Sequence, residues 1–215
     1  MIPAMRRRFL RSAATLAFGL LAGCESRKAP APAPPSAAPA ALAPAVLDSA
    51  NKLLQTRRED EAERLLTETV RQHPDNAALL NLLGAALVER SQFAAAEARF
   101  RRAAELDSTL ADPWARLGWL LYESQGKAVE AKQLLQRALE IDPDHERARY
   151  TLGLVYQREG VLDSAAMAFA DLLARIPSAE AHRQLGLVYL RQGALEQATA
   201  ALREAKRWWP YDPQV

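Results

Sequence analysis

The stretch ADPWARLGWLLYESQGKAVEAKQLLQRALEIDPDH, residues 111–145, decides the fold of this 215-residue chain. Its apolar residues recur at helical spacing in two runs, the first around Leu117-Gly118 and the second around Leu135. Asp112-Pro113 predicts the start of the first helix, with Asp112 as N-cap and proline at the first helical position. Pro143 cannot continue a helix and ends the second one. The stretch therefore predicts a pair of helices joined by a turn.

The same arrangement recurs along the chain. Leu-Gly pairs stand at 83–84, 117–118, 152–153 and 185–186, so their glycines are 34, 35 and 33 residues apart. Self-similarity at such a period is the signature of stacked repeats. An alanine follows in the second half of each copy, and large residues recur between copies. These positions are Ala96, Ala131, Ala165 and Ala198, with Trp114, Tyr156 and Phe169 among the large residues.

This pattern resembles the tetratricopeptide repeat, W-x2-L-G-x2-Y followed by A-x3-F and P over 34 residues. Four copies match it, with Ser108 where proline is usual and Arg149 in place of the tryptophan; a degenerate first copy is marked by Ala62, Leu66 and Pro74. The resemblance implies an all-α, right-handed superhelical solenoid of about five helix-turn-helix hairpins within residues 45–212. The expected repeats are about 43–76, 77–110, 111–145, 146–178 and 179–212.

Each signature position has a physical cause. Glycine and alanine allow the two helices of a hairpin to approach closely, while the large residues fill the space between hairpins. Burying one such residue contributes roughly 1.5–3 kcal/mol. One hairpin cannot cover its own apolar face, so neighbouring hairpins must stack, and the stack presents a concave groove.

In the tetratricopeptide family the groove is lined by the first helix of each hairpin, at about positions 2, 5, 9, 12 and 13. The resemblance thus implies a groove that binds a protein or peptide segment. Carried onto this chain, the partner-binding residues are Asn81, Trp119, Tyr122, Arg147, Tyr150, Gln157, Arg158, Arg183 and Arg191.

Two features of this set suggest a binding function. The aromatic residues Trp119, Tyr122 and Tyr150 are suitable binding anchors, although their helical spacing also fits core packing. The arginines cluster in the C-terminal half, whereas Glu89, Asp112 and Glu123 lie in the N-terminal half, so the groove could orient an extended peptide. The alternative is that these charges are solvated side chains. Asn81 is a candidate for hydrogen bonding to a peptide backbone.

Catalytic and metal motifs find little support in the sequence. The three histidines are scattered, and no His-x3-His, paired cysteines or phosphate loop occurs. Asp142, Asp144 and His145 cluster at a repeat turn, where capping explains them better than a metal ion does. We therefore expect no enzyme activity, no catalytic residue, no metal and no cofactor.

The first 23 residues have the parts of an export signal: four arginines, then an apolar stretch from about Phe9 to Ala22. It ends in Leu21-Ala22-Gly23-Cys24, which resembles the lipobox of bacterial lipoproteins. That resemblance implies cleavage before Cys24, the only cysteine, and attachment of a diacylglyceryl group to its thiol. Two acyl chains hold a protein stably at a membrane. The alternative is a signal peptide with a chance cysteine.

The N-terminal region leaves open the route by which the protein is exported and the membrane in which it is anchored. Arg6-Arg7-Arg8-Phe9-Leu10-Arg11 resembles the twin-arginine motif but also fits an ordinary cationic signal, so either Tat or Sec export is possible. Glu25, rather than Asp, after the cysteine favours the outer membrane over the inner one. Residues 24–44 form a Pro/Ala-rich linker whose twenty or so residues would reach about 60 Å when extended.

The net charge bears on whether nucleic acid is a partner. The whole chain carries 28 basic and 26 acidic residues; removing the four arginines of the signal leaves 24 against 26, a net charge of −2. A domain this close to neutrality gives no reason to expect nucleic-acid binding.

The sequence therefore predicts a membrane-anchored scaffold that binds an unidentified partner protein, with roles in envelope, secretion or pilus assembly as candidates. The alternative is a cell-wall factor that recruits peptidoglycan-modifying enzymes or contacts peptidoglycan. Trp208-Trp209 is either a self-packed end or a contact site, and the oligomeric state is not readable from the sequence.

Overall fold

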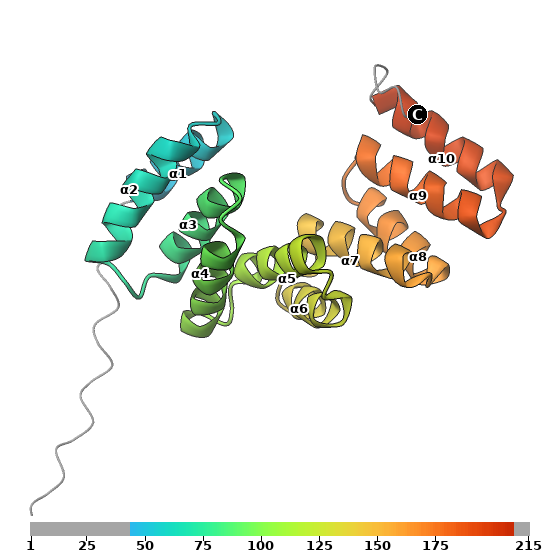
Figure 1. The fold of residues 1–215 in the computed structure, drawn as a ribbon. Helices are drawn as coiled ribbons and strands as arrows, with labels where there is room; N and C mark the ends of the chain where they lie inside the picture. Colours follow the sequence, from blue (N-terminus) through green and yellow to red (C-terminus); the bar gives the residue numbers. More distant parts are fainter. Residues whose placement is uncertain (1–43, 209–215) are drawn as a thin grey trace, which may run out of the picture. The chain divides into compact units, whose positions relative to one another are not determined.

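The structure, a computed structural model, describes residues 44–208. This part of the chain consists of ten helices arranged as successive antiparallel pairs, which confirms the predicted all-α fold (Figure 1). The helices are α1 Pro44–Gln55, α2 Glu59–Gln72, α3 Ala77–Glu89, α4 Phe93–Leu106, α5 Ala111–Gln125, α6 Ala128–Ile141, α7 Glu146–Glu159, α8 Leu162–Leu173, α9 Ala179–Gln192 and α10 Leu195–Trp208.

Side-chain caps fix the starts of several first helices. The amide of Leu79 donates to Asn76 Oδ1 at 3.0 Å, and the amide of Ala181 donates to Ser178 Oγ at 3.2 Å. Such caps satisfy backbone N–H groups that have no partner within the helix. The N-cap predicted at Asp112 is wrong: α5 begins at Ala111 after Leu110, and no side chain caps it. Asp112 lies in the first turn, where its carboxylate is held by Arg116 of the same helix, by Asn81 of α3 and by His145 just before α7.

The first helices of successive hairpins form one layer. Helix α1 contacts α3, α3 contacts α5 and α5 contacts α7, while each second helix packs against its own partner and the first helix of the next hairpin. The first helices α1, α3, α5 and α7 therefore lie side by side, and each of α2, α4 and α6 packs against two consecutive first helices. Side chains on the exposed face of the first helices therefore gather on a common surface.

Glycines allow the close packing within four of the five hairpins, as predicted. A Cβ placed on Gly118 would lie 2.8 Å from Leu135 Cγ and 3.2 Å from the carbonyl oxygen of Ala131. One placed on Gly84 would lie 2.5 Å from Phe100 Cε1. The partner alanines Ala96, Ala131, Ala165 and Ala198 are completely buried. The helix axes can thus approach only because these positions carry little or no side chain.

The core of the stack consists of two buried clusters. One buried cluster extends from α1 to α7, and a smaller one joins α8, α9 and α10. Leu154 and Tyr156 of α7 pack against both clusters and connect them. Each hairpin is therefore stabilised mainly by its neighbours, as expected for a repeat protein.

None of the helices within residues 44–208 is long and apolar enough to cross a membrane. The predicted signal segment, Cys24 and most of the Pro/Ala-rich linker lie outside the described residues, as does Trp209. Those predictions stay predictions.

Replacing Gly118 with valine should lower the free energy of unfolding by about 2 kcal/mol, because the new side chain overpacks against Leu135 and the α6 backbone. Urea unfolding followed by circular dichroism measures the loss. Glu123→Val, at an exposed position of the same helix, controls for the helix propensity of valine. Equal midpoints for the two variants would show that the close approach at Gly118 is not required.

Candidate functional site

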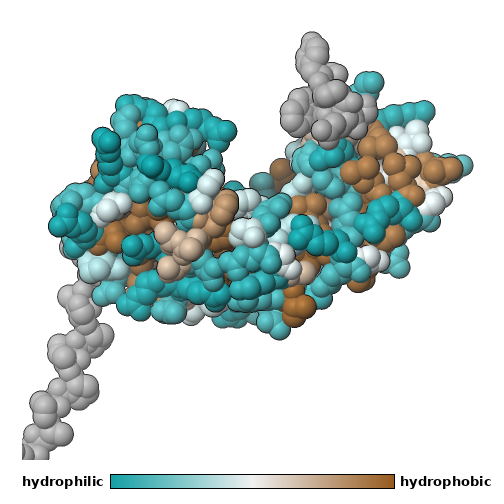
Figure 2. Space-filling view, viewed as in Figure 1, coloured by the Kyte–Doolittle hydropathy of each residue, from teal (hydrophilic) through white to brown (hydrophobic). Residues whose placement is uncertain are grey.

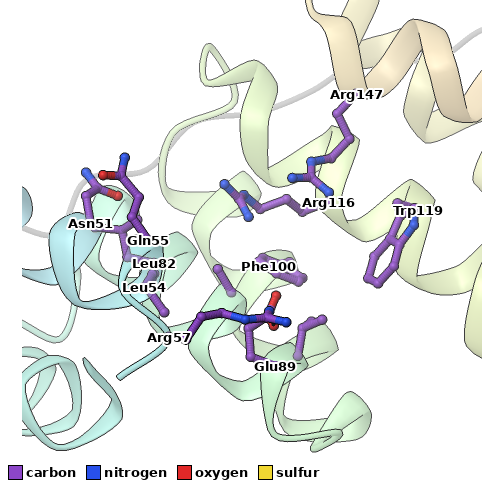
Figure 3. Close-up of a pocket in the computed structure, with 12 residues that line it drawn as sticks. Asn51, Leu54, Gln55, Arg57, Leu82, Glu89, Phe100, Arg116, Trp119 and Arg147 are labelled. Atoms are coloured by element: carbon purple, nitrogen blue, oxygen red, sulfur yellow. The ribbon is translucent and has the colours of Figure 1, made fainter. Parts of the chain in front are cut away.

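A hollow of about 400 Å³ opens between the first helices of four hairpins (Figure 3). It combines an apolar floor with charged and amide side chains. Figure 3 shows Arg116, Arg147 and Trp119 projecting toward it from one side and residues of α1 facing them. Its lining residues are Asn51, Leu54, Gln55 and Arg57 from α1 and the turn after it, Leu82, Ala85, Val88 and Glu89 from α3, Phe100 from α4, Arg116 and Trp119 from α5, and Arg147 from α7.

Two of the three arginines in the hollow are paired with carboxylates. Arg57 Nη1 donates to Glu89 Oε2 at 3.0 Å, and Arg116 Nε donates to Asp112 Oδ2 at 2.8 Å. Within residues 44–208, Arg147 forms no ion pair or hydrogen bond and the residue is exposed. The hollow therefore carries one guanidinium whose charge no neighbouring carboxylate matches directly.

The environment of Arg147 also bears on its ionisation. The walls of the hollow desolvate the guanidinium and Arg116 repels it, which lowers the pKa of Arg147, while Asp112 and Glu89 act in the opposite direction. Arginine nevertheless stays protonated in proteins. Its positive charge is thus only partly compensated, and an anionic ligand would relieve the repulsion between the two arginines.

Asp112 joins three hairpins beneath this hollow. Its Oδ2 accepts a hydrogen bond from Asn81 Nδ2 at 2.8 Å as well as the one from Arg116, and its Oδ1 lies 3.3 Å from His145 Nε2. A carboxylate can only accept here, so Nε2 of His145 carries the proton, while Nδ1 accepts from the Ala148 amide and caps α7. Burial opposes ionisation of Asp112, but the His145 hydrogen bond and the charge of Arg116 outweigh it and lower the pKa of Asp112 well below its ordinary value.

The hollow continues in both directions along the first helices. A neighbouring hollow of about 250 Å³ shares Asn51, Leu82 and Arg116 with it and extends toward Leu47 and Leu110. Another, of about 300 Å³, shares Arg147 and extends between α7, the end of α8 and the start of α9. The three hollows form a groove, which we call the inner groove, defined by their shared residues Asn51, Leu82, Arg116 and Arg147.

The predicted binding residues divide into two groups. Trp119 and Arg147 line the central hollow, Asn81 lines the hollow toward α1, and Tyr150 lines the hollow toward α9. Asn81 is 7% exposed and already donates to Asp112, so its side chain amide is a joint between hairpins as well as part of the groove wall.

Among the remaining predicted residues, Tyr122, Arg158 and Arg191 form joints between neighbouring first helices. Tyr122 is 6% exposed; its hydroxyl donates to the carbonyl oxygen of Leu154, and the Arg158 guanidinium lies 3.8 Å from its ring centroid. Arg158 Nη1 also donates to the Tyr122 carbonyl oxygen, and Arg191 Nη1 donates to that of Gln157. Each arginine thus neutralises the last turn of the preceding first helix, where carbonyl groups lack helical partners.

A similar joint ties α7 to α9. The Tyr150 hydroxyl donates to Glu180 Oε1 at 2.9 Å, and Arg183 Nε donates to Glu180 Oε2 at 2.9 Å. Burial and the charge of Glu180 raise the pKa of Tyr150 above its ordinary value. Glu89 and Asp112 likewise pair with arginines, whereas Glu123, the third acidic residue expected in the N-terminal half, is exposed and forms no ion pair among residues 44–208.

Sequence reasoning missed Arg116 and the whole contribution of α1. Arg116 is not at one of the family's groove positions, although its spacing of four residues from Asp112 could have indicated an ion pair. Asn51 and Gln55 belong to the degenerate first repeat, where the missing Leu-Gly pair left no register from which to count groove positions.

Asp142 and His145, at the turn before α7, accept hydrogen bonds from backbone amides. Asp142 Oδ1 accepts from the Asp144 amide at 3.0 Å, and His145 caps α7. Within residues 44–208 no three His, Cys, Asp or Glu side chains are grouped so as to hold a metal ion.

A second feature of the surface is an apolar area over α9 and α10 (Figure 2). Leu190 is 44% exposed, Leu195 is 66% exposed and Trp208 is 55% exposed. Leu195 occupies the position that Leu162 has in α8, where the following hairpin partly buries it. The exposure therefore reflects the place of α10 as the last described helix.

Two tetratricopeptide repeat profiles match the chain, one at residues 47–111 and 86–146 and the other at residues 123–185. The chain belongs to the tetratricopeptide repeat family. A TPR repeat-containing protein of Pseudomonas aeruginosa is 35% identical over 104 residues, which make up 46% of this chain and 17% of that protein. The chain thus spans less than a fifth of that relative's length.

Solved tetratricopeptide structures share the fold. TTC0263 of Thermus thermophilus matches with a TM-score of 0.66 at 22% identity over 79% of this chain and 92% of that one. The pilF protein of Pseudomonas aeruginosa matches with 0.67 at 18% identity, covering 80% and 93%. YrrB, described as a TPR protein with an unusual peptide-binding site, matches with 0.61 at 24% identity, covering 79% and 87%. At these identities the likeness shows the fold alone.

The Asp112 joint has a pH signature. Asp112→Asn should lower the free energy of unfolding by about 1 kcal/mol above pH 5, a modest amount because the side chain is 41% exposed. Because the pKa of Asp112 is lower in the folded state than in the unfolded state, its ionised carboxylate stabilises the fold. This stabilisation is complete above the pKa of the unfolded state, about 3.9, and declines as the pH falls below that value. The difference from wild type should therefore shrink between pH 5 and pH 3 in urea unfolding experiments. A difference that stays constant over this range, or an equal effect of Asp48→Asn at an exposed site of α1, would contradict the assignment.

Proposed function

We propose that this chain is a lipid-anchored scaffold of the bacterial cell envelope that holds a segment of a partner protein in the inner groove. The observation that carries the proposal is the row of three connected hollows along the first helices. An extended segment needs such a continuous track, whereas a small substrate would be served by one closed pocket.

Family membership supports the binding role, because stacked helical repeats use their concave face as an extended binding surface. The fold is shared with YrrB, which is described as having a peptide-binding site. Trp119 supplies a half-buried aromatic wall in the central hollow, and aromatic side chains in such settings are frequent binding anchors.

The cellular location in this proposal rests on the sequence around Cys24. The lipid fixes the chain at the membrane, the linker of residues 24–44 sets its reach, and the stack of hairpins presents the groove. Glu25 favours the outer membrane, facing the periplasm, after export by Sec or Tat. A role in envelope, secretion or pilus assembly fits this location.

Lipidation is tested by Cys24→Ala in the full-length chain. The variant should incorporate no alkyne-tagged palmitate and should keep its first 23 residues, because processing depends on the modified thiol. Mass spectrometry of the purified chain measures both the label and the cleavage. Wild-type labelling and cleavage in the variant would contradict the lipid anchor.

The binding role is tested by capture of tagged full-length protein from detergent-solubilised envelopes, with Trp119→Ala as the groove variant. Met167→Ala is the matched control, since Met167 is 67% exposed on the outer helix α8. One envelope protein retained by wild type and by the control, and reduced at least about tenfold with Trp119→Ala, is the expected result.

The same material separates the proposal from its alternative. Unchanged helicity of Trp119→Ala by circular dichroism shows that any loss of binding is local. Capture of the same proteins by all three forms would exclude the inner groove as the site. Binding of the purified protein to bare sacculi, without added protein, would favour the cell-wall factor instead.

A further inference from the structure

The polar groups of the central hollow indicate the chemistry of its ligand, because not all of them have a partner within the protein. Arg57 and Arg116 have carboxylate partners, whereas Arg147 has none among residues 44–208. Three guanidinium groups and one carboxylate, that of Glu89, line this space (Figure 3), and the carboxylate of Asp112, which pairs with Arg116, lines the neighbouring hollow. A ligand with a carboxylate would balance the remaining charge and could bond Arg147 through two N–H groups.

The wall beside this arginine is apolar. Leu82 is almost fully buried, and Leu54, Val88 and Trp119 are half-buried around the hollow. Side chains in that state still offer a face to a ligand, so the hollow suits an aliphatic or aromatic group next to the carboxylate.

The opposite wall offers amide groups. Asn51 and Gln55 are one turn apart on α1, both are exposed, and both line the hollow. Each carries a donor and an acceptor, as a peptide unit does, and could pair with a ligand backbone. This wall is therefore suited to an extended peptide rather than to a free anion.

The groove also indicates which kind of carboxylate fits. The central hollow has a neighbouring hollow on each side: it shares Asn51, Leu82 and Arg116 with one and Arg147 with the other. A chain that follows all three hollows passes Leu110, runs by Arg147 and continues toward α9. This continuity favours the side chain of Asp or Glu inside a segment over a terminal carboxylate, which would require the chain to stop at Arg147.

We infer that the hollow between α1, α3, α5 and α7 recognises an internal segment of a partner protein in which an acidic residue stands beside a large apolar one. Arg147, assisted by Arg116, binds the carboxylate; Trp119 and Leu82 contact the apolar side chain; Asn51 and Gln55 bond the backbone. The inference rests on the proposed function and adds the chemistry of the ligand to it.

The test is selection of random dodecapeptides displayed between two carrier sequences, so that no peptide has a free end. Wild-type protein should enrich peptides with Asp or Glu next to Leu, Ile, Phe or Trp, and Arg147→Gln should not. Arg137→Gln, on the outer helix α6, is the matched control and should behave as wild type.

A selected peptide is then synthesised with both ends blocked and its binding is followed by fluorescence anisotropy. Replacing its acidic residue with the corresponding amide should weaken binding to wild type roughly tenfold, and should have little effect on binding to Arg147→Gln. The wild-type affinity should also fall as salt is raised, since the contact is between charges.

The outcomes distinguish this inference from the function on which it rests. Enriched peptides that bind through Trp119 but show no acidic preference would overturn the inference and leave the groove as a binding site. Binding gained only when a free C-terminal carboxylate is present would overturn the internal segment. Failure to enrich any peptide, or equal binding by Trp119→Ala, would overturn both.

Discussion

The structure depends on the close approach of the two helices in each hairpin. No space is left for a Cβ at Gly84, beside the Phe100 ring, or at Gly118, beside Leu135, and the buried residues Ala96 and Ala131 of the second helices carry only a methyl group. This contact fixes the hairpin as a flat unit whose apolar residues must be covered by the next one. The layer of first helices, and with it the inner groove, follows from that repeated contact.

Polar side chains on the inner layer serve two purposes. Asn81, Asp112 and His145 connect three hairpins by hydrogen bonds. The Arg158 guanidinium of α7 packs on the Tyr122 ring of α5. Groups held in this way fix the relative position of the repeats and are costly to break once desolvated. Arg147 has no such bond among residues 44–208, and this difference from its neighbours is the reason for proposing it as a ligand contact.

The sequence predicted the fold well because period and small residues are local signals. It predicted the groove less well because a position in a repeat does not specify a partner. Tyr122 and Arg158 stand at groove positions yet bond each other, since the preceding helix ends beside them. Asp112 looked like an N-cap, but its carboxylate is held by Arg116 of the same helix and by Asn81 and His145, which only stacking brings near. Asn51 and Gln55 could not be placed without the register that the first repeat lacks.

The central claim is that the inner layer of helices is the surface that meets the partner. A photoreactive amino acid placed at Gln55 on α1 or at Gln133 on the outer helix α6 tests it in living cells, since both glutamines are exposed. The account predicts a covalent adduct with an envelope protein from position 55 and none from position 133. An adduct formed from position 133 alone would contradict it.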